Sequence, residues 1–147
     1  MKEREVILYC DLHGHSRHKN IFMYGNNIKE APQASRVFPY ILSKLCDYFS
    51  FEQSRFSMSR MKEGTARIAM FNELKIPNIF TMEASFCGAN RGELKDMHFT
   101  TDHLQNAGKK LMEALIVYCN IEVKRNDGST APAITAKAME QELSQNK

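Results

Sequence analysis

The sequence lacks three features that would assign a class of protein at once: a long apolar run, closely spaced cysteines and a strong excess of one charge. The apolar run at residues 6–10 ends at Asp11, far short of the roughly 20 apolar residues that cross a bilayer. The four cysteines form no C-x-x-C pair, and they lie at positions 10, 46, 87 and 119. This spacing is unlike that of zinc ribbons and disulfide-rich scaffolds. We therefore expect a cytoplasmic protein with no membrane partner.

The charge balance gives little indication of a partner. Twenty Lys and Arg residues against 17 Asp and Glu residues leave a formal net charge of +3, well below that of polybasic nucleic-acid or membrane-surface binders. We expect no nucleic-acid partner. The 147 residues, 43% of them hydrophobic, are enough for one apolar core, so function must be argued from individual sites.

The order of elements predicts an α/β fold. Apolar and polar periodicity indicates strands at 6–10 and 78–82, helices at 34–49, 66–74 and 101–119, and an irregular segment at 11–33. A strand remains the alternative for 66–74, and Pro39 would kink or restart the helix that contains it. Alternating strands and helices favour a mostly parallel sheet. Sites in such sheets form beyond the carboxyl ends of the strands, which brings His13 and Glu83 toward one edge.

A histidine-rich segment, residues 11–19, holds three of the five histidines and two fixed cations. Imidazole is a common zinc ligand, although a solvated histidine-rich loop is an equally good interpretation. Binding of one ion by both His13 and His15 is expected to need a bend at Gly14.

Glu83 follows a short apolar run, where a carboxylate loses part of its hydration and suits a general base. The alternative is a structural acid paired with an arginine, for which Arg67 is a candidate. Arg67 is also a candidate receptor for a carboxylate, because a guanidinium can hold one through two parallel hydrogen bonds. Nearby, Cys87 is expected to be a small buried apolar residue.

Four motifs then resemble one family. They are Asp11-Leu-His-Gly-His-Ser-Arg17, Asn20-Ile-Phe-Met-Tyr-Gly25, Glu63-Gly-Thr-Ala-Arg67 and Thr81-Met-Glu-Ala-Ser-Phe-Cys-Gly88. In this order they resemble the second half of the catalytic domain of the cytosolic carboxypeptidases, over residues 6–119. These are zinc metallocarboxypeptidases that remove glutamates from the carboxyl ends of tubulin and other acidic proteins.

The resemblance implies a role for each candidate residue. His13 matches a zinc ligand, and Glu83 matches the glutamate that activates the attacking water. Arg67 lies in the segment near the pocket for the terminal side chain of the substrate, and Arg17 would favour acidic tails, as would Lys19. His15 is expected to shape the site without binding the metal.

One part of the family pattern is missing. The other two zinc ligands come from an upstream His-x-x-Glu, and none of the five histidines here is followed by Glu at that spacing. We therefore expect a zinc-carboxypeptidase-like, mixed but mostly parallel sheet flanked by helices, present as a C-terminal partial domain at 1–123. A polar tail at 124–147 is expected to be a frayed helix or disordered. The alternative function is a non-catalytic fragment or pseudoenzyme that binds acidic peptides.

Overall fold

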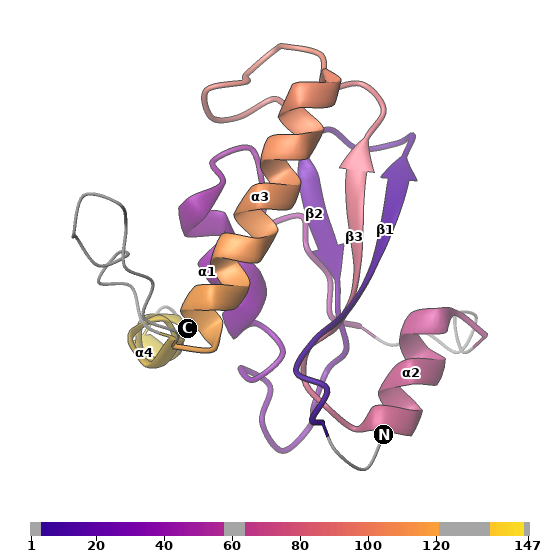
Figure 1. Ribbon diagram of the computed structural model, residues 1–147, viewed down its shortest axis with the longest axis vertical. Helices are drawn as coiled ribbons and strands as arrows, with labels where there is room; N and C mark the ends of the chain where they lie inside the picture. Colours follow the sequence, from indigo (N-terminus) through magenta and orange to yellow (C-terminus); the bar gives the residue numbers. More distant parts are fainter. Residues whose placement is uncertain (1–3, 58–63, 121–135, 146–147) are drawn as a thin grey trace.

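The computed structural model describes residues 4–57, 64–120 and 136–145 of the chain. Within them the elements are, in order, β1 (Tyr9–His15), β2 (Ile21–Tyr24), α1 (Val37–Leu45), α2 (Ala66–Leu74), β3 (Ile79–Ser85), α3 (Thr101–Tyr118) and α4 (Ala136–Gln145) (Figure 1). None of these helices is both long and apolar enough to cross a bilayer.

The described strands form one mixed sheet in the order β1-β3-β2. β1 runs parallel to β3, whereas β2 runs antiparallel to it. His13 lies directly opposite Glu83 in the β1–β3 register. With helices flanking this sheet (Figure 1), the prediction of a mixed α/β fold is confirmed.

The main core lies on one face of the sheet, beneath α1 and α3. Phe80 of β3 stacks on Phe38 of α1, with ring centroids 5.7 Å apart, and both side chains have no exposed surface. Met23 of β2 is equally buried. Burial of each such side chain contributes about 1.5–3 kcal/mol, so these contacts fix the strands against the helices.

The strands extend further toward the polar segments than the sequence predicted. β1 begins at Tyr9 and continues to His15, and β2 lies within the segment expected to be irregular. β3 continues to Ser85, so Glu83 lies inside the strand and not after it. Pairing with β3 supplies the hydrogen bonds that hold polar residues of β1 extended.

The two helices predicted at 66–74 and 101–119 are confirmed, as α2 and α3. The side chain of Thr100 accepts a hydrogen bond from the backbone N–H of His103, whose side chain in turn accepts from the backbone N–H of Thr100. This capping box satisfies N–H groups that the first turn of a helix leaves without partners. Pro39 lies in the first turn of α1, where its missing N–H costs no helical hydrogen bond.

The described part of the tail is a helix that packs on α1. Glu142 of α4 accepts hydrogen bonds from Tyr40 Oη at 2.6 Å and from Lys44 Nζ at 2.9 Å, and Leu143 is 9% exposed. The expected boundary between residues 123 and 124 lies outside the described residues, and the division of the chain at that point stays a prediction.

Candidate functional site

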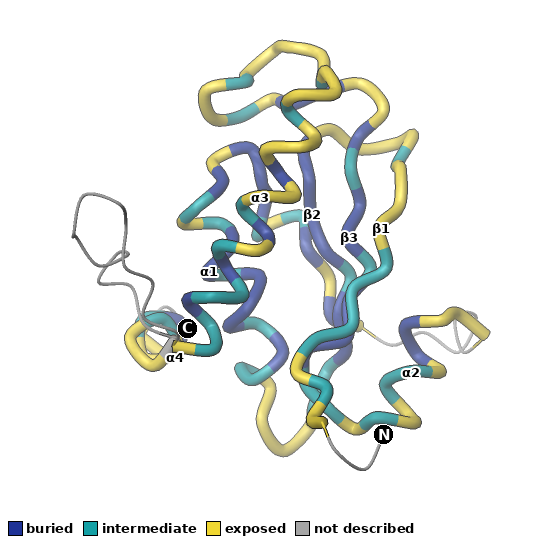
Figure 2. The backbone as a smooth tube through the Cα atoms, viewed as in Figure 1, coloured by how far each residue is buried: buried dark blue, intermediate teal, exposed yellow. Residues whose placement is uncertain are grey.

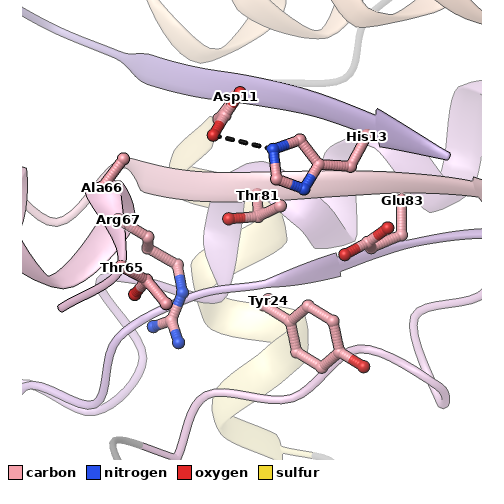
Figure 3. Close-up of a pocket in the computed structure, with 8 residues that line it drawn as sticks. All are labelled: Asp11, His13, Tyr24, Thr65, Ala66, Arg67, Thr81 and Glu83. Atoms are coloured by element: carbon pink, nitrogen blue, oxygen red, sulfur yellow. Dashed lines mark hydrogen bonds and ion pairs between the residues drawn. The ribbon is translucent and has the colours of Figure 1, made fainter. Parts of the chain in front are cut away.

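A pocket of about 170 Å³ lies on the sheet face opposite the main core. Figure 3 shows its lining residues, which are Asp11, His13, Tyr24, Thr65, Ala66, Arg67, Thr81 and Glu83. His13 and Glu83 reach into it from adjacent strands, and Arg67 enters from α2.

The twofold repeat of side-chain direction in a strand explains this grouping. On β3, Thr81 and Glu83 face the pocket, while Phe80 and Met82, which alternate with them, face the core. The β1–β3 register places Asp11 beside Thr81 and His13 beside Glu83. Alternation along paired strands therefore separates an apolar face from a face that carries ionisable groups.

Asp11 orients the imidazole of His13. Oδ2 of Asp11 lies 2.9 Å from Nε2 of His13, and an ionised carboxylate only accepts hydrogen bonds. In the neutral imidazole, Nε2 of His13 therefore carries the proton, and Nδ1 keeps its lone pair. A carboxylate that fixes the tautomer in this way is a common partner of metal-binding histidines, so this pair fits one donor of a metal centre.

Glu83 is paired with His15 and not with an arginine. Glu83 is 8% exposed, and its Oε2 lies 3.6 Å from Nδ1 of His15. The imidazole of His15 stacks on that of His18, with centroids 5.2 Å apart, and meets the edge of Phe22. The alternative interpretation, in which Glu83 pairs with Arg67, is wrong, because Arg67 bonds to Gly25 and Asn26. His15 instead holds a position beside the Glu83 carboxylate.

The expected bend at Gly14 is also wrong. β1 continues through Gly14 to His15, and residues two apart in a strand share one face. His13 and His15 therefore lie on the same side of the sheet without any bend.

Arg67 is a buried cation that also lines the pocket. It is 3% exposed, and its Nη1 donates to the carbonyl oxygen of Gly25 and to Oδ1 of Asn26, each at 2.5 Å. Burial lowers the pKa of the Arg67 guanidinium from its usual value. The hydrogen bonds tie α2 to the segment that follows β2.

Arg17 does not join this group. It is exposed in the connection between β1 and β2, as is Lys19, and neither lines the pocket. The structure therefore brings together three of the four predicted site residues, His13, Glu83 and Arg67, and leaves Arg17 on the surface.

Sequence reasoning did not select Thr81 or Tyr24, which also line the pocket. Thr81 could have been found from its twofold spacing to Glu83, whereas no sequence pattern predicts that Tyr24 faces Thr81 across the β2–β3 pair. Cys87 is exposed, so the expectation that it is buried is wrong.

The described part of the chain supplies too few ligands for a metal ion. No group of three or more His, Cys, Asp or Glu side chains among residues 4–57, 64–120 and 136–145 is placed to hold an ion. A catalytic zinc site normally takes three protein ligands. His13 with Asp11 fits one of them, so these residues do not form a metal centre by themselves.

Comparison with solved structures defines the class of fold. The chain is similar to a metallo-carboxypeptidase from Burkholderia cenocepacia, with a TM-score of 0.59 and 13% sequence identity, over 76% of this chain and 30% of that one. The fold is thus that of the metallo-carboxypeptidases. No protein-family model matches the chain.

Sequence comparison then identifies the relatives. The chain is 46% identical over 125 residues to cytosolic carboxypeptidase 3 of Bos taurus, 48% over 124 to cytosolic carboxypeptidase 2 of Xenopus tropicalis and 43% over 123 to that of Homo sapiens. Each match covers 82% of this chain but only 12–14% of the relative. The chain is a homologue of the cytosolic carboxypeptidases, as its four motifs predicted.

Proposed function

We propose that this chain is the part of a zinc-dependent metallocarboxypeptidase that carries the general base, Glu83, and one metal ligand, His13. The complete enzyme would remove carboxyl-terminal residues, glutamate above all, from acidic protein tails such as those of tubulin. The names of the relatives support a carboxypeptidase that acts in the cytosol. The observation that carries the proposal is the juxtaposition of His13 and Glu83 on adjacent strands, facing one pocket.

Zinc is proposed as the metal because imidazole is one of its preferred ligands. The contact of Asp11 with Nε2 leaves the lone pair of Nδ1 of His13 free to bind the metal. The remaining ligands would come from outside the described residues. When bound, zinc would supply the Lewis acid that polarises the scissile carbonyl.

Glu83 would accept a proton from the attacking water and later pass it to the leaving amine. The carboxylate lines the pocket but is largely removed from bulk water, which suits a base that must exchange a proton with a reacting group. Its neighbour His15 limits the directions in which the carboxylate can turn.

Cationic side chains would bind the acidic substrate. Arg67 lines the pocket. Those of its guanidinium N–H groups that do not bond to Gly25 or Asn26 would donate hydrogen bonds to a carboxylate of the substrate. Arg17 lies outside the pocket and would act at longer range, by raising the local positive potential. Such an effect weakens as salt is added.

The test is a chimera in which this chain replaces the matched segment of human cytosolic carboxypeptidase 2. The chimera should release glutamate from a peptide that ends in several glutamates, and should release lysine more slowly from a peptide that ends in lysines. Glu83→Gln should abolish release, because an amide cannot accept the proton. The matched control is Glu73→Gln on the exposed surface of α2, which should retain full activity.

Zinc content of the purified variants separates the two predicted roles. Glu83→Gln should keep the zinc of the parent chimera, whereas His13→Gln should lose most of it. Normal turnover by Glu83→Gln would refute the role of general base.

The second candidate function is binding of acidic peptides without catalysis. The incomplete donor set in the described residues favours it. Calorimetric titration of the isolated chain with a polyglutamate peptide, followed by mass spectrometry of that peptide, should then show binding without cleavage. Equal binding after Arg67→Lys would count against Arg67 as the receptor.

A further inference from the structure

His15 lies beside Glu83 on the pocket face of the sheet, two residues after His13 on β1. Nδ1 of the His15 imidazole is 3.6 Å from Oε2 of Glu83. This distance is longer than that of a formed hydrogen bond, but such contacts in active sites often shorten when substrate binds. A small movement of either side chain would therefore give the Glu83 carboxylate a donor.

The two ring nitrogens of His15 have different surroundings. Nδ1 faces the carboxylate of Glu83, which only accepts hydrogen bonds when it is ionised. Nε2 is buried and has no hydrogen-bond partner in the part of the chain that the structure describes. A proton on Nε2 would meet no acceptor there, and the lone pair of Nδ1 would then face the carboxylate. The neutral ring of His15 therefore carries its proton on Nδ1.

Aromatic contacts fix the plane of the His15 ring. The imidazole of His18 stacks on it with an interplanar angle of 4°, and the Phe22 ring meets it at 86° with centroids 5.0 Å apart. Phe22 is 1% exposed. Figure 2 shows β2 buried along most of its length, whereas the connection that carries His18 is exposed. One contact thus comes from a buried strand, and the other comes from a surface segment that covers the ring.

The residues on either side of Glu83 in the sheet do not orient its carboxylate. Phe22 of β2 and His13 of β1 lie opposite Glu83 in the two strand pairs. The Phe22 side chain has no hydrogen-bonding group, and His13 is held by Asp11 as the proposed metal ligand. The last torsion of a glutamate side chain has broad energy minima, so the carboxylate needs a partner to fix its direction.

We propose that His15 is a positioning residue for the general base, because its Nδ1–H holds Oε2 of Glu83 and leaves Oε1 to accept the proton of the attacking water. This inference deepens the proposed function and rests on it. A carboxylate held in one direction before the reaction does not have to be ordered in the transition state, which lowers the barrier. His18 acts one step further away, because it holds the plane of the His15 ring.

The test compares three replacements of His15 in the chimera with human cytosolic carboxypeptidase 2. Asparagine places an amide N–H near the position of Nδ1, glutamine places one near Nε2, and leucine donates no hydrogen bond. His15→Gln and His15→Leu should lower kcat about tenfold or more, as loss of a hydrogen bond to a charged group would. His15→Asn should recover most of this loss. KM should change little in all three, because His15 acts through Glu83.

Controls separate positioning from metal binding and from a merely structural role. All three variants should keep the zinc of the parent chimera, and loss of zinc would overturn the proposal because His15 would then be a ligand. Circular dichroism gives the folded fraction of each variant. A merely structural role would leave the activity per folded molecule equal in His15→Asn and His15→Gln. His98→Asn, at an exposed histidine, is the matched control and should behave like the parent.

A second pair of variants tests the stacked ring. His18→Ala removes the ring that covers His15 and should lower kcat about two- to tenfold, as loss of one aromatic contact would. His18→Phe keeps a flat ring at this position and should lose less. In the background of His15→Leu the two replacements of His18 should have equal kcat, because the donor that the stack holds is gone.

Nitrogen NMR of the free chain at pH 8 gives a readout that does not depend on catalysis. The proton of His15 should lie mainly on Nδ1, opposite to that of His13. Glu83→Ala should populate both tautomers of His15, whereas Glu73→Ala on the exposed surface of α2 should leave the ratio unchanged.

Two results would overturn the proposal: equal kcat for the asparagine, glutamine and leucine variants of His15, or a His15 proton that lies mainly on Nε2. An inactive parent chimera contradicts the proposed function alone, because the tautomer of the free chain still decides whether His15 donates to Glu83. An active chimera whose turnover needs Glu83 but is insensitive to His15 contradicts the positioning role alone.

Discussion

Replacement of Arg67 by methionine should destabilise the whole chain and not merely impair substrate binding. Arg67 is 3% exposed, and its Nη1 bonds to the Gly25 carbonyl and to Oδ1 of Asn26. Gly25 and Asn26 are themselves buried. Methionine fills much of the same space but donates no hydrogen bond, so the substitution leaves two buried oxygens without this donor.

The cost follows from those two oxygens. A buried acceptor that loses its partner costs about 1–3 kcal/mol, which gives about 2–6 kcal/mol for the pair. Burial of the cation is itself unfavourable, as its lowered pKa indicates, and methionine removes that penalty. We therefore expect a net loss of about 3 kcal/mol, a large part of the roughly 5–15 kcal/mol that stabilises a typical domain.

Urea unfolding followed by far-ultraviolet circular dichroism measures this loss. The matched control is Arg17→Met, at the exposed cation between β1 and β2, which should change the unfolding free energy by less than about 0.5 kcal/mol. Equal free energies for the two variants would refute the reasoning, because the bonds to Gly25 and Asn26 would then contribute nothing to stability. The expected difference also means that activities of Arg67 variants must be corrected for the folded fraction.

Two further predictions concern the pocket and the free thiols. At pH 8, nitrogen NMR should show the proton of the His13 imidazole mainly on Nε2, and Asp11→Ala should populate both tautomers; an unchanged ratio would contradict the role of Asp11. Iodoacetamide at pH 8 should alkylate exposed Cys87 well before Cys10, because burial raises the pKa of the Cys10 thiol to about 12 and only the thiolate reacts. Mass spectrometry measures both rates, and similar rates would contradict this account.

Apolar periodicity predicted the elements whose faces pack in the core. α3 repeats apolar residues at helical spacing, and of these Ala107 and Leu111 are buried, although Leu104 remains 44% exposed. The pattern could not predict the ends of strands. The apolar run of β3 stops at Met82, yet pairing with β1 continues to Ser85, because tertiary hydrogen bonds override local composition.

β1 shows why a functional strand is hard to predict. Its sequence, Tyr-Cys-Asp-Leu-His-Gly-His, looks like the end of a strand followed by a loop. One of its faces lines a polar pocket, and the other carries the exposed Leu12. Cys10 and Leu12 do alternate with Asp11, His13 and His15, but two apolar residues are too few for this alternation to distinguish a strand from a loop.

The candidate site was predictable where it depends on strand register and not where it depends on loops. His13 and Glu83 lie on neighbouring parallel strands. The rule that sites form at the carboxyl ends of such strands therefore predicted that they lie close together, even though both fall inside the strands. Arg17 lies in the connection from β1 to β2, whose path no residue pattern specified. Its exposed position could be found only from the structure.

The position of the proposed base depends on the face of β3 that never meets the pocket. Phe80 stacks on Phe38, and Met82 lies in the same core, so residues on the helix side hold Thr81 and Glu83 in place on the pocket side. Packed interiors tolerate little change in volume. A smaller residue at Met82 would therefore shift the Glu83 carboxylate, although the two side chains lie on opposite faces of β3. Catalysis by Glu83 thus depends on the packing of the core-facing side chains of the same strand.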